Sequence, residues 1–136
     1  MPAPYSETLW DHFNSPRNAG RMPAPATVGN ASLGGRAPHF TIYVKVDGDR
    51  VTKASFQTTG CGYAIAACSA LTELVAGKMI AECQAISVPQ LVRALDGMPE
   101  HKRFCARLAI DALRDALSKS DVKHEDVTQV PTNRED

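Results

Sequence analysis

The stretch "FTIYVKVDGDRVTKASFQTTGCGYAIAACSALTELVAG" (residues 40–77) decides the fold. Its first half contains two runs rich in β-branched and aromatic residues, 40–46 and 50–58, joined by a short turn that includes Gly48. This pattern predicts a β-hairpin. In the second half, apolar residues recur at helical spacing, at Ala64, Cys68, Leu71 and Val75. They predict an amphipathic helix that begins at about residue 62 and stops at Gly77.

Weaker patterns flank this central unit. Ser6 can cap a short helix over about residues 6–14, and the Pro-, Ala- and Gly-rich segment 22–35 predicts a loop with at most one edge strand. Downstream, a short helix is expected within residues 87–97, and a last helix from near Pro99 to about Ser118. The order of elements predicts the α+β class, with helices packed on one face of a small antiparallel β-sheet.

The chain divides into a folded part and a charged end. We expect residues 1–118 to form a single domain, since no internal repeat or second core pattern occurs. Residues 119–136 are charged and lack an apolar period, which predicts a mobile, disordered C-terminal tail.

Composition narrows the class of function. Fifteen basic residues balance fifteen acidic ones, so nucleic acid is not an expected partner. The sequence has no signal-peptide pattern and no apolar run long enough for a bilayer, which predicts a soluble, cytoplasmic protein without membrane contact. No phosphate loop, G-x-S-x-G or H-E-x-x-H pattern is present, and we expect no enzyme.

Cys61 is the first candidate for chemistry among the four cysteines, none of which forms a C-x-x-C pair. It lies between Gly60 and Gly62, where the predicted strand gives way to the predicted helix. Amides at a helix N-terminus lower a thiol pKa and favour a reactive thiolate. The alternative is a small residue that only fills a tight turn.

Cys105 is the second candidate. His101 precedes it by one helical turn, which is the spacing of a metal-binding pair, whereas the alternative is a core cysteine beside a solvated histidine. Cys68 lies about 10 Å along the helix from Cys61, too far to share one ion directly. We therefore interpret Cys68 and Cys83 as packing residues.

Four segments resemble one known family in order and spacing. They are "YSETLWDHFNSPRNAG" (5–20), "FQTTGCGYAIAACSALTELVAGK" (56–78), "AECQAI" (81–86) and "CARLAIDALRDAL" (105–117). Over about residues 5–117 they resemble the IscU/NifU N-terminal iron–sulfur scaffold family. The resemblance implies an IscU/NifU-like α+β domain that assembles a [2Fe-2S] cluster, takes sulfur from a cysteine desulfurase and passes the cluster to acceptor apoproteins.

The resemblance also implies a site and shows departures from it. Cys61 and Cys105 match two of the family's three site cysteines, but Arg36, Pro38 and Phe104 stand at the positions of the other cysteine, the aspartate and the histidine. A [2Fe-2S] cluster needs four ligands. His39 and His101 could complete the metal site, a second subunit in a homo-oligomer or a partner could supply ligands, or the site holds no cluster.

Three functions remain open at this point. The chain holds a cluster or bound iron or zinc, or it carries sulfur as a persulfide on Cys61 or Cys105, or it is an interaction module without this chemistry. The segment "MPEHK" (98–102) keeps only Pro99 and Lys102 of the family's chaperone-recognition segment. This argues against recognition by a dedicated Hsp70-type chaperone.

Overall fold

A computed structural model describes residues 6–126 of the chain. The elements, in chain order, are α1 (Glu7–Asn14), β1 (Thr27–Leu33), β2 (Arg36–Asp47), β3 (Arg50–Thr58), α2 (Gly62–Val75), α3 (Ile80–Gln84), α4 (Val88–Ala94), the 3-10 turn η1 (Glu100–Lys102) and α5 (Arg103–Asp126). The predicted hairpin and the predicted helices that follow it are therefore present in the expected order.

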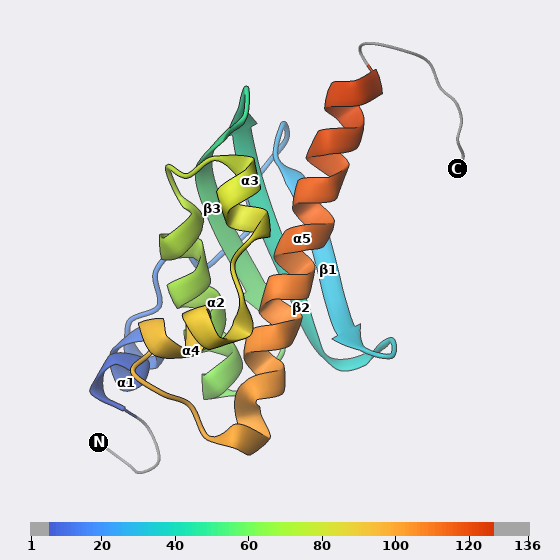
Figure 1. Ribbon diagram of the computed structural model, residues 1–136. Helices are drawn as coiled ribbons and strands as arrows, with labels where there is room; N and C mark the ends of the chain where they lie inside the picture. Colours follow the sequence, from blue (N-terminus) through green and yellow to red (C-terminus); the bar gives the residue numbers. More distant parts are fainter. Residues whose placement is uncertain (1–5, 127–136) are drawn as a thin grey trace.

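The three strands form one antiparallel sheet in the order β1-β2-β3 (Figure 1). In the central strand, Ile42 lies opposite Gly29 on one side and opposite Phe56 on the other. Gly48 occupies the turn between β2 and β3 with a φ of +65°, a conformation that glycine adopts without strain. The edge strand expected within residues 22–35 is β1, which pairs with residues 36–44 of β2.

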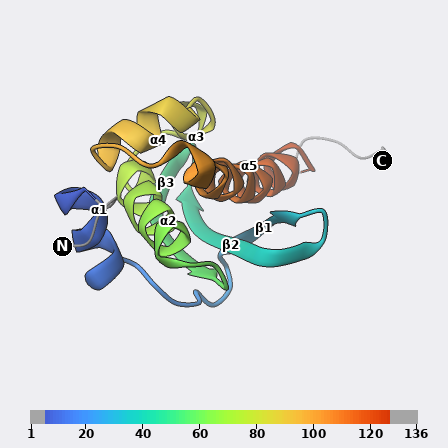
Figure 2. The same ribbon diagram turned by 90° about the horizontal axis from the view of Figure 1, so that it is seen from below.

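Helices cover one face of this sheet, as predicted. α5 packs on β1 and β2, and α2 packs on β3 (Figures 1 and 2). The backbones approach closely, since a Cβ at Gly29 would lie 2.1 Å from the Ala112 carbonyl oxygen. Phe40, Ile42 and Val44 are fully buried beneath the helices, so their face of β2 forms the core.

α1 packs against α2 through apolar and polar side chains: Leu9 belongs to the hydrophobic core, and a hydrogen bond joins the two helices. The Ser6 hydroxyl caps α1 by accepting from the Leu9 N–H at 2.9 Å. The His12 Nδ1 and Ser69 Oγ atoms are 2.7 Å apart in a buried hydrogen bond between the two helices. Residues after α1 then run along β3, where the Phe56 N–H donates to the Asn18 carbonyl at 3.0 Å. The N-terminal segment is thereby fixed against the domain.

The last helix is longer than the sequence pattern predicts. The apolar pattern predicts an end at about Ser118, but α5 continues to Asp126. No glycine or proline occurs between Pro99 and Pro131, so nothing in the local sequence stops the helix where its apolar stripe ends. The predicted tail therefore starts too early, and residues 127–136 lie outside the part that the structure describes.

Within residues 6–126, no helix has both the length and the apolar character needed to cross a bilayer.

Candidate functional site

Cys61 is the N-cap residue of α2 and is exposed, as the sequence predicts for a reactive thiol. Hydrogen bonds fix the turn before it: the Gly60 N–H donates to Thr58 Oγ1 at 3.1 Å, and the Thr59 N–H donates to the His39 carbonyl at 3.1 Å. The His39 N–H in turn donates to Thr59 Oγ1 at 2.9 Å. The backbone of β2 thus holds the segment that presents Cys61.

Packing requires a glycine next to this cysteine. A Cβ at Gly60 would lie 2.4 Å from the Ala64 Cβ and 3.3 Å from the Pro38 Cβ. The first distance is shorter than side chains tolerate, so any larger residue at position 60 displaces the start of α2. Pro38 therefore packs beside the Cys61 turn, where the family resemblance places an aspartate.

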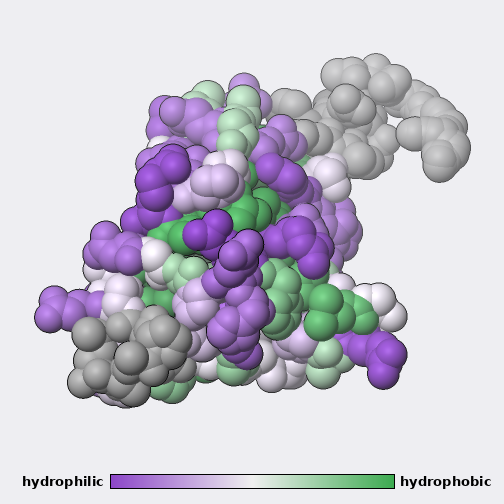
Figure 3. Space-filling view, turned by 60° about the horizontal axis from the view of Figure 1, so that its bottom comes forward, coloured by the Kyte–Doolittle hydropathy of each residue, from purple (hydrophilic) through white to green (hydrophobic). Residues whose placement is uncertain are grey.

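The starts of α2 and α5 lie at the same end of the molecule, at the bottom of Figure 1. Cys105, in the first turns of α5, is only 1% exposed, and its thiol is close enough to that of Cys61 for each to shift the pKa of the other. The structure therefore brings together the two cysteines proposed from the sequence. Seen from this end, apolar residues reach the surface between hydrophilic ones (Figure 3).

The surroundings of Cys61 favour its thiolate. Partial burial alone raises its pKa, but the backbone N–H groups of Ala64 and Tyr63, the Lys102 ammonium and the Cys105 thiol together hold the pKa below its ordinary value. The thiol makes no regular capping hydrogen bond to α2. The helix amides thus remain available to stabilise negative charge on sulfur.

The neighbouring thiols behave differently. Burial, together with the nearby Cys61, raises the pKa of Cys105 to about 12. Burial also raises the pKa of Cys68, and Cys105 adds to this effect, so Cys68 packs in the core as predicted. The site thus has one exposed, activated sulfur with a buried thiol behind it.

The two histidines predicted as extra ligands are both exposed. His39 belongs to β2 and joins the Cys61 turn through its backbone, and His101 lies in η1. Across the described residues, no set of three or more His, Cys, Asp or Glu side chains is arranged to hold a metal ion. The structure therefore pairs Cys61 with Cys105, while the ligand roles of His39 and His101 stay predictions.

Lys102 is the site residue that the sequence interpretation missed. Its Nζ lies 3.8 Å from Cys61 Sγ, and the rings of Tyr63 and Phe104 lie 5.6 and 6.0 Å from it, measured to the ring centroids. The sequence did contain a signal for this residue. Lys102 precedes Cys105 by three residues, so both lie near the start of the last predicted helix. The contact with Cys61 depends on tertiary packing, which spacing does not reveal.

Comparison with known proteins identifies the family. Residues 4–126 match the family described as "NifU-like N terminal domain". The chain belongs to this family. It is 42% identical over 116 residues to "Iron-sulfur cluster assembly scaffold protein IscU 1" of Archaeoglobus fulgidus, a match that covers 83% of this chain and 74% of the relative. It is 37% identical over 118 residues to the protein of Haemophilus influenzae named "Iron-sulfur cluster assembly scaffold protein IscU", covering 84% of this chain and 93% of that one.

Solved structures agree on the fold of this NifU-like domain. The N-terminal part of a nitrogen-fixing NifU-like protein from Brucella abortus has a TM-score of 0.70 at 17% identity, covering 87% of this chain and 94% of that one. A putative scaffold protein for the SUF system from Fervidobacterium islandicum has a TM-score of 0.67 at 19% identity, with coverage of 83% and 96%. The predicted IscU/NifU-like α+β fold is therefore confirmed.

Proposed function

We propose that this protein is an iron–sulfur cluster assembly scaffold that holds a [2Fe-2S] cluster, or its iron and sulfur precursors, as cargo. The family membership supports this function, and its relatives are named as such scaffolds. The observation that carries it is the pairing of an exposed, activated Cys61 with Cys105 where α2 and α5 begin. The cargo is released afterwards, so the protein acts as a scaffold rather than an enzyme.

Cys61 and Cys105 supply two of the four ligands that a [2Fe-2S] cluster needs. His39 lies on the strand that holds the Cys61 turn, and His101 lies in the turn that leads to Cys105. These histidines, or groups from a second copy of the chain or a protein partner, complete the coordination of the cluster or of bound iron or zinc. Thiolate and imidazole are ligands that suit all of these metals.

Sulfur reaches the site from a cysteine desulfurase in the cytoplasm. The Cys61 thiolate attacks the outer sulfur of the persulfide on that partner, the partner's S–S bond breaks, and its cysteine leaves as a thiolate. The product is a persulfide on Cys61, and no external oxidant or reductant is consumed in this step. An assembled cluster then passes to an acceptor apoprotein.

Anaerobic reconstitution tests the function. The full chain is incubated with ferrous iron, cysteine and a cysteine desulfurase, and bound iron, acid-labile sulfide and visible absorbance are then measured. We expect uptake by the wild type and by the Cys83→Ser control, and loss of uptake in Cys61→Ser and Cys105→Ser. Equal uptake by Cys61→Ser and the wild type contradicts the proposal.

A persulfide carrier is the second candidate. It is favoured by the arrangement of the described residues, in which one sulfur is activated and no three-ligand set is formed. Sulfur carriage needs a single reactive thiol. In the same experiment, a carrier gains one sulfur atom by intact mass and retains no iron, whereas an interaction module gains neither.

A further inference from the structure

The Lys102 side chain is held over the exposed sulfur by groups from two helices. Its Nζ lies 3.8 Å from Cys61 Sγ, 5.6 Å from the Tyr63 ring centroid and 6.0 Å from the Phe104 ring centroid. Tyr63 belongs to the first turn of α2 and is buried, whereas Phe104 belongs to the start of α5 and is half-buried. Aromatic faces attract an ammonium group at such distances. The rings therefore restrict where the Lys102 charge can lie.

Among the described residues, no carboxylate pairs with the Lys102 ammonium. The first turn of α2 contains no acidic residue either. Lys102 and the α2 amides together make this end of the molecule locally positive beside a single exposed sulfur, although the chain as a whole has no net charge.

We propose that Lys102 is a positioning residue that holds the anionic outer sulfur of a persulfide formed on Cys61. The inference rests on the proposed function, because it concerns sulfur delivered to that site. An S–S bond of about 2 Å places the outer sulfur within reach of an ammonium that already lies 3.8 Å from Sγ. The ammonium neutralises charge on that sulfur and keeps the persulfide at the α2 start.

Phe104 gives this role its structural basis. The family resemblance places a histidine at this position, and a phenyl ring cannot ligate a metal ion. The Phe104 ring, at the start of α5, instead lies 6.0 Å from the Lys102 ammonium, measured to its centroid. The chain has thus exchanged a ligand for a group that orients a positive charge.

Transfer from a small persulfide tests the role of Lys102. The reduced full chain is treated anaerobically with glutathione persulfide, whose outer sulfur is attacked by the Cys61 thiolate while the S–S bond breaks and glutathione leaves as a thiolate. Mass spectrometry then follows one added sulfur on Cys61 over time. We expect Lys102→Met to shorten the lifetime of this persulfide about five- to tenfold, the effect of losing an opposite charge within about 4–6 Å.

Two variants control for packing. Lys102→Arg keeps the charge and stacks on aromatic rings, so we expect a lifetime within about twofold of the wild type. Lys53→Met removes an exposed lysine of β3 and is expected to match the wild type. An unchanged lifetime in Lys102→Met overturns the proposal, as does a loss in Lys102→Met that Lys102→Arg does not restore.

A second readout separates this inference from the proposed function. The rate of Cys61 alkylation by anionic iodoacetate, divided by the rate with neutral iodoacetamide, reports the local charge. We expect Lys102→Met to lower this ratio about three- to fivefold, as follows from one unit charge at about 5 Å in water, and Lys102→Arg to preserve it. An unchanged ratio overturns the positioning role.

The two proposals can fail separately. If the ratio and the persulfide lifetime depend on Lys102 while the wild type takes up no iron and sulfide, the scaffold function fails and the role of Lys102 stands.

Discussion

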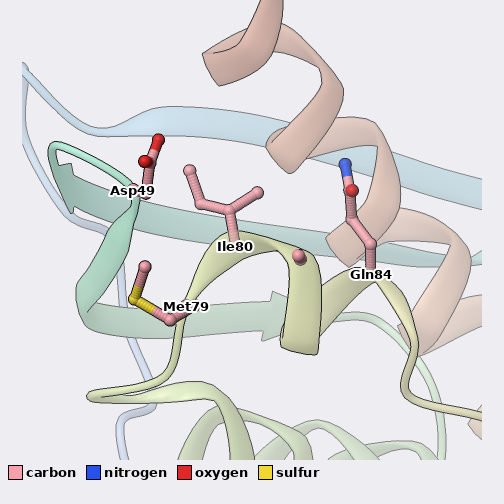
Figure 4. Close-up of a pocket in the computed structure, with 5 residues that line it drawn as sticks. Asp49, Met79, Ile80 and Gln84 are labelled. Carbon is pink, nitrogen blue, oxygen red and sulfur yellow. The ribbon is translucent and has the colours of Figure 1, made fainter.

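Three helices of this protein begin close to a cysteine, α2 at Cys61, α3 near Cys83 and α5 near Cys105, and the starts of the first two differ in charge. At the start of α2, the first turn has no acidic residue, and the amides and Lys102 face an exposed thiol. At the start of α3, the Glu82 carboxylate accepts from the Met79 N–H at 3.0 Å, and Cys83 is fully buried. The pocket beside α3 at the other end of the molecule is lined by Asp49, Met79, Ile80, Ala81 and Gln84, without a thiol (Figure 4).

The difference lies in what occupies the positive end of each helix. Glu82 neutralises the start of α3, and burial together with the Glu82 charge raises the pKa of Cys83. Its thiol donates a weak hydrogen bond to the Val75 carbonyl, with a sulfur–oxygen distance of 3.7 Å. The first turn of α2 has no carboxylate, and the sulfur of Cys61 lies at the positive end of this helix instead. A cysteine near a helix start is therefore reactive only where no carboxylate caps the helix and solvent reaches the thiol.

Alkylation of the native protein at pH 7 should show the largest contrast. The pKa of Cys61 lies below its ordinary value, because backbone amides of α2 and the Lys102 ammonium favour the thiolate, whereas that of Cys105 is about 12, so Cys61 has by far the larger thiolate fraction. Because the thiolate is the reactive form, the Cys61 rate should rise with pH and level off at a lower pH than that of an ordinary cysteine. Peptide mapping after iodoacetamide treatment measures these rates. If Cys83 were labelled as fast as Cys61, the proposed difference in thiol reactivity between the starts of α2 and α3 would be wrong.

Replacing a glycine by alanine should affect both stability and Cys61 reactivity at one end of the molecule, but only stability at the other. Gly60→Ala should cost about 2 kcal/mol of stability, because its Cβ would lie 2.4 Å from the Ala64 Cβ, and should also slow Cys61 alkylation. Gly48→Ala meets no atom within 4 Å but has a φ of +65°, so it should cost about 1 kcal/mol and leave the Cys61 rate unchanged. Urea unfolding and alkylation measure both effects. Equal alkylation in the two variants would contradict the packing role of Gly60.

The fold was largely predictable from the sequence because its signals are local. The β-hairpin and α2 follow from the β-branched and aromatic runs and from the helical spacing of apolar residues within residues 40–77. The end of α5 was not predictable from amphipathicity, because a helix without glycine or proline continues past the end of its apolar sequence stripe to Asp126. A pattern of burial thus marks where a helix packs, and a helix breaker marks where it ends.

The site was predictable only in part. The local sequence indicates an activated Cys61, because strand, glycine and helix follow one another directly. Its pairing with Cys105 came from the family resemblance, since no spacing rule relates the start of α2 to that of α5. The approach of Lys102 to Cys61 was missed for the same reason: it arises when two helices pack side by side.

A carboxylate at the start of α2 should make it resemble α3. Gly62→Glu places a negative charge in the first helical turn beside Cys61, which should raise the thiol pKa and slow its alkylation at pH 7 about three- to fivefold. Gly62→Gln has a similar size without the charge and should alkylate at nearly the wild-type rate. Iodoacetamide kinetics compare the two variants, and the difference should shrink at high salt. Equal rates for Glu and Gln would show that the helix start does not control Cys61.

Removing the carboxylate from α3 should have the smallest effect. Glu82→Ala leaves the Met79 N–H without its partner, which should cost about 0.5–1 kcal/mol of stability in urea unfolding. Cys83 should nevertheless stay unreactive in the native protein, because it remains buried and its thiol still faces the Val75 carbonyl. Only brief openings of α3 should expose it, raising its labelling rate a few-fold while the Cys61 rate stays constant. If Cys83 instead became as reactive as Cys61, the carboxylate alone would account for the contrast between the two helix starts, and burial would have no part in it.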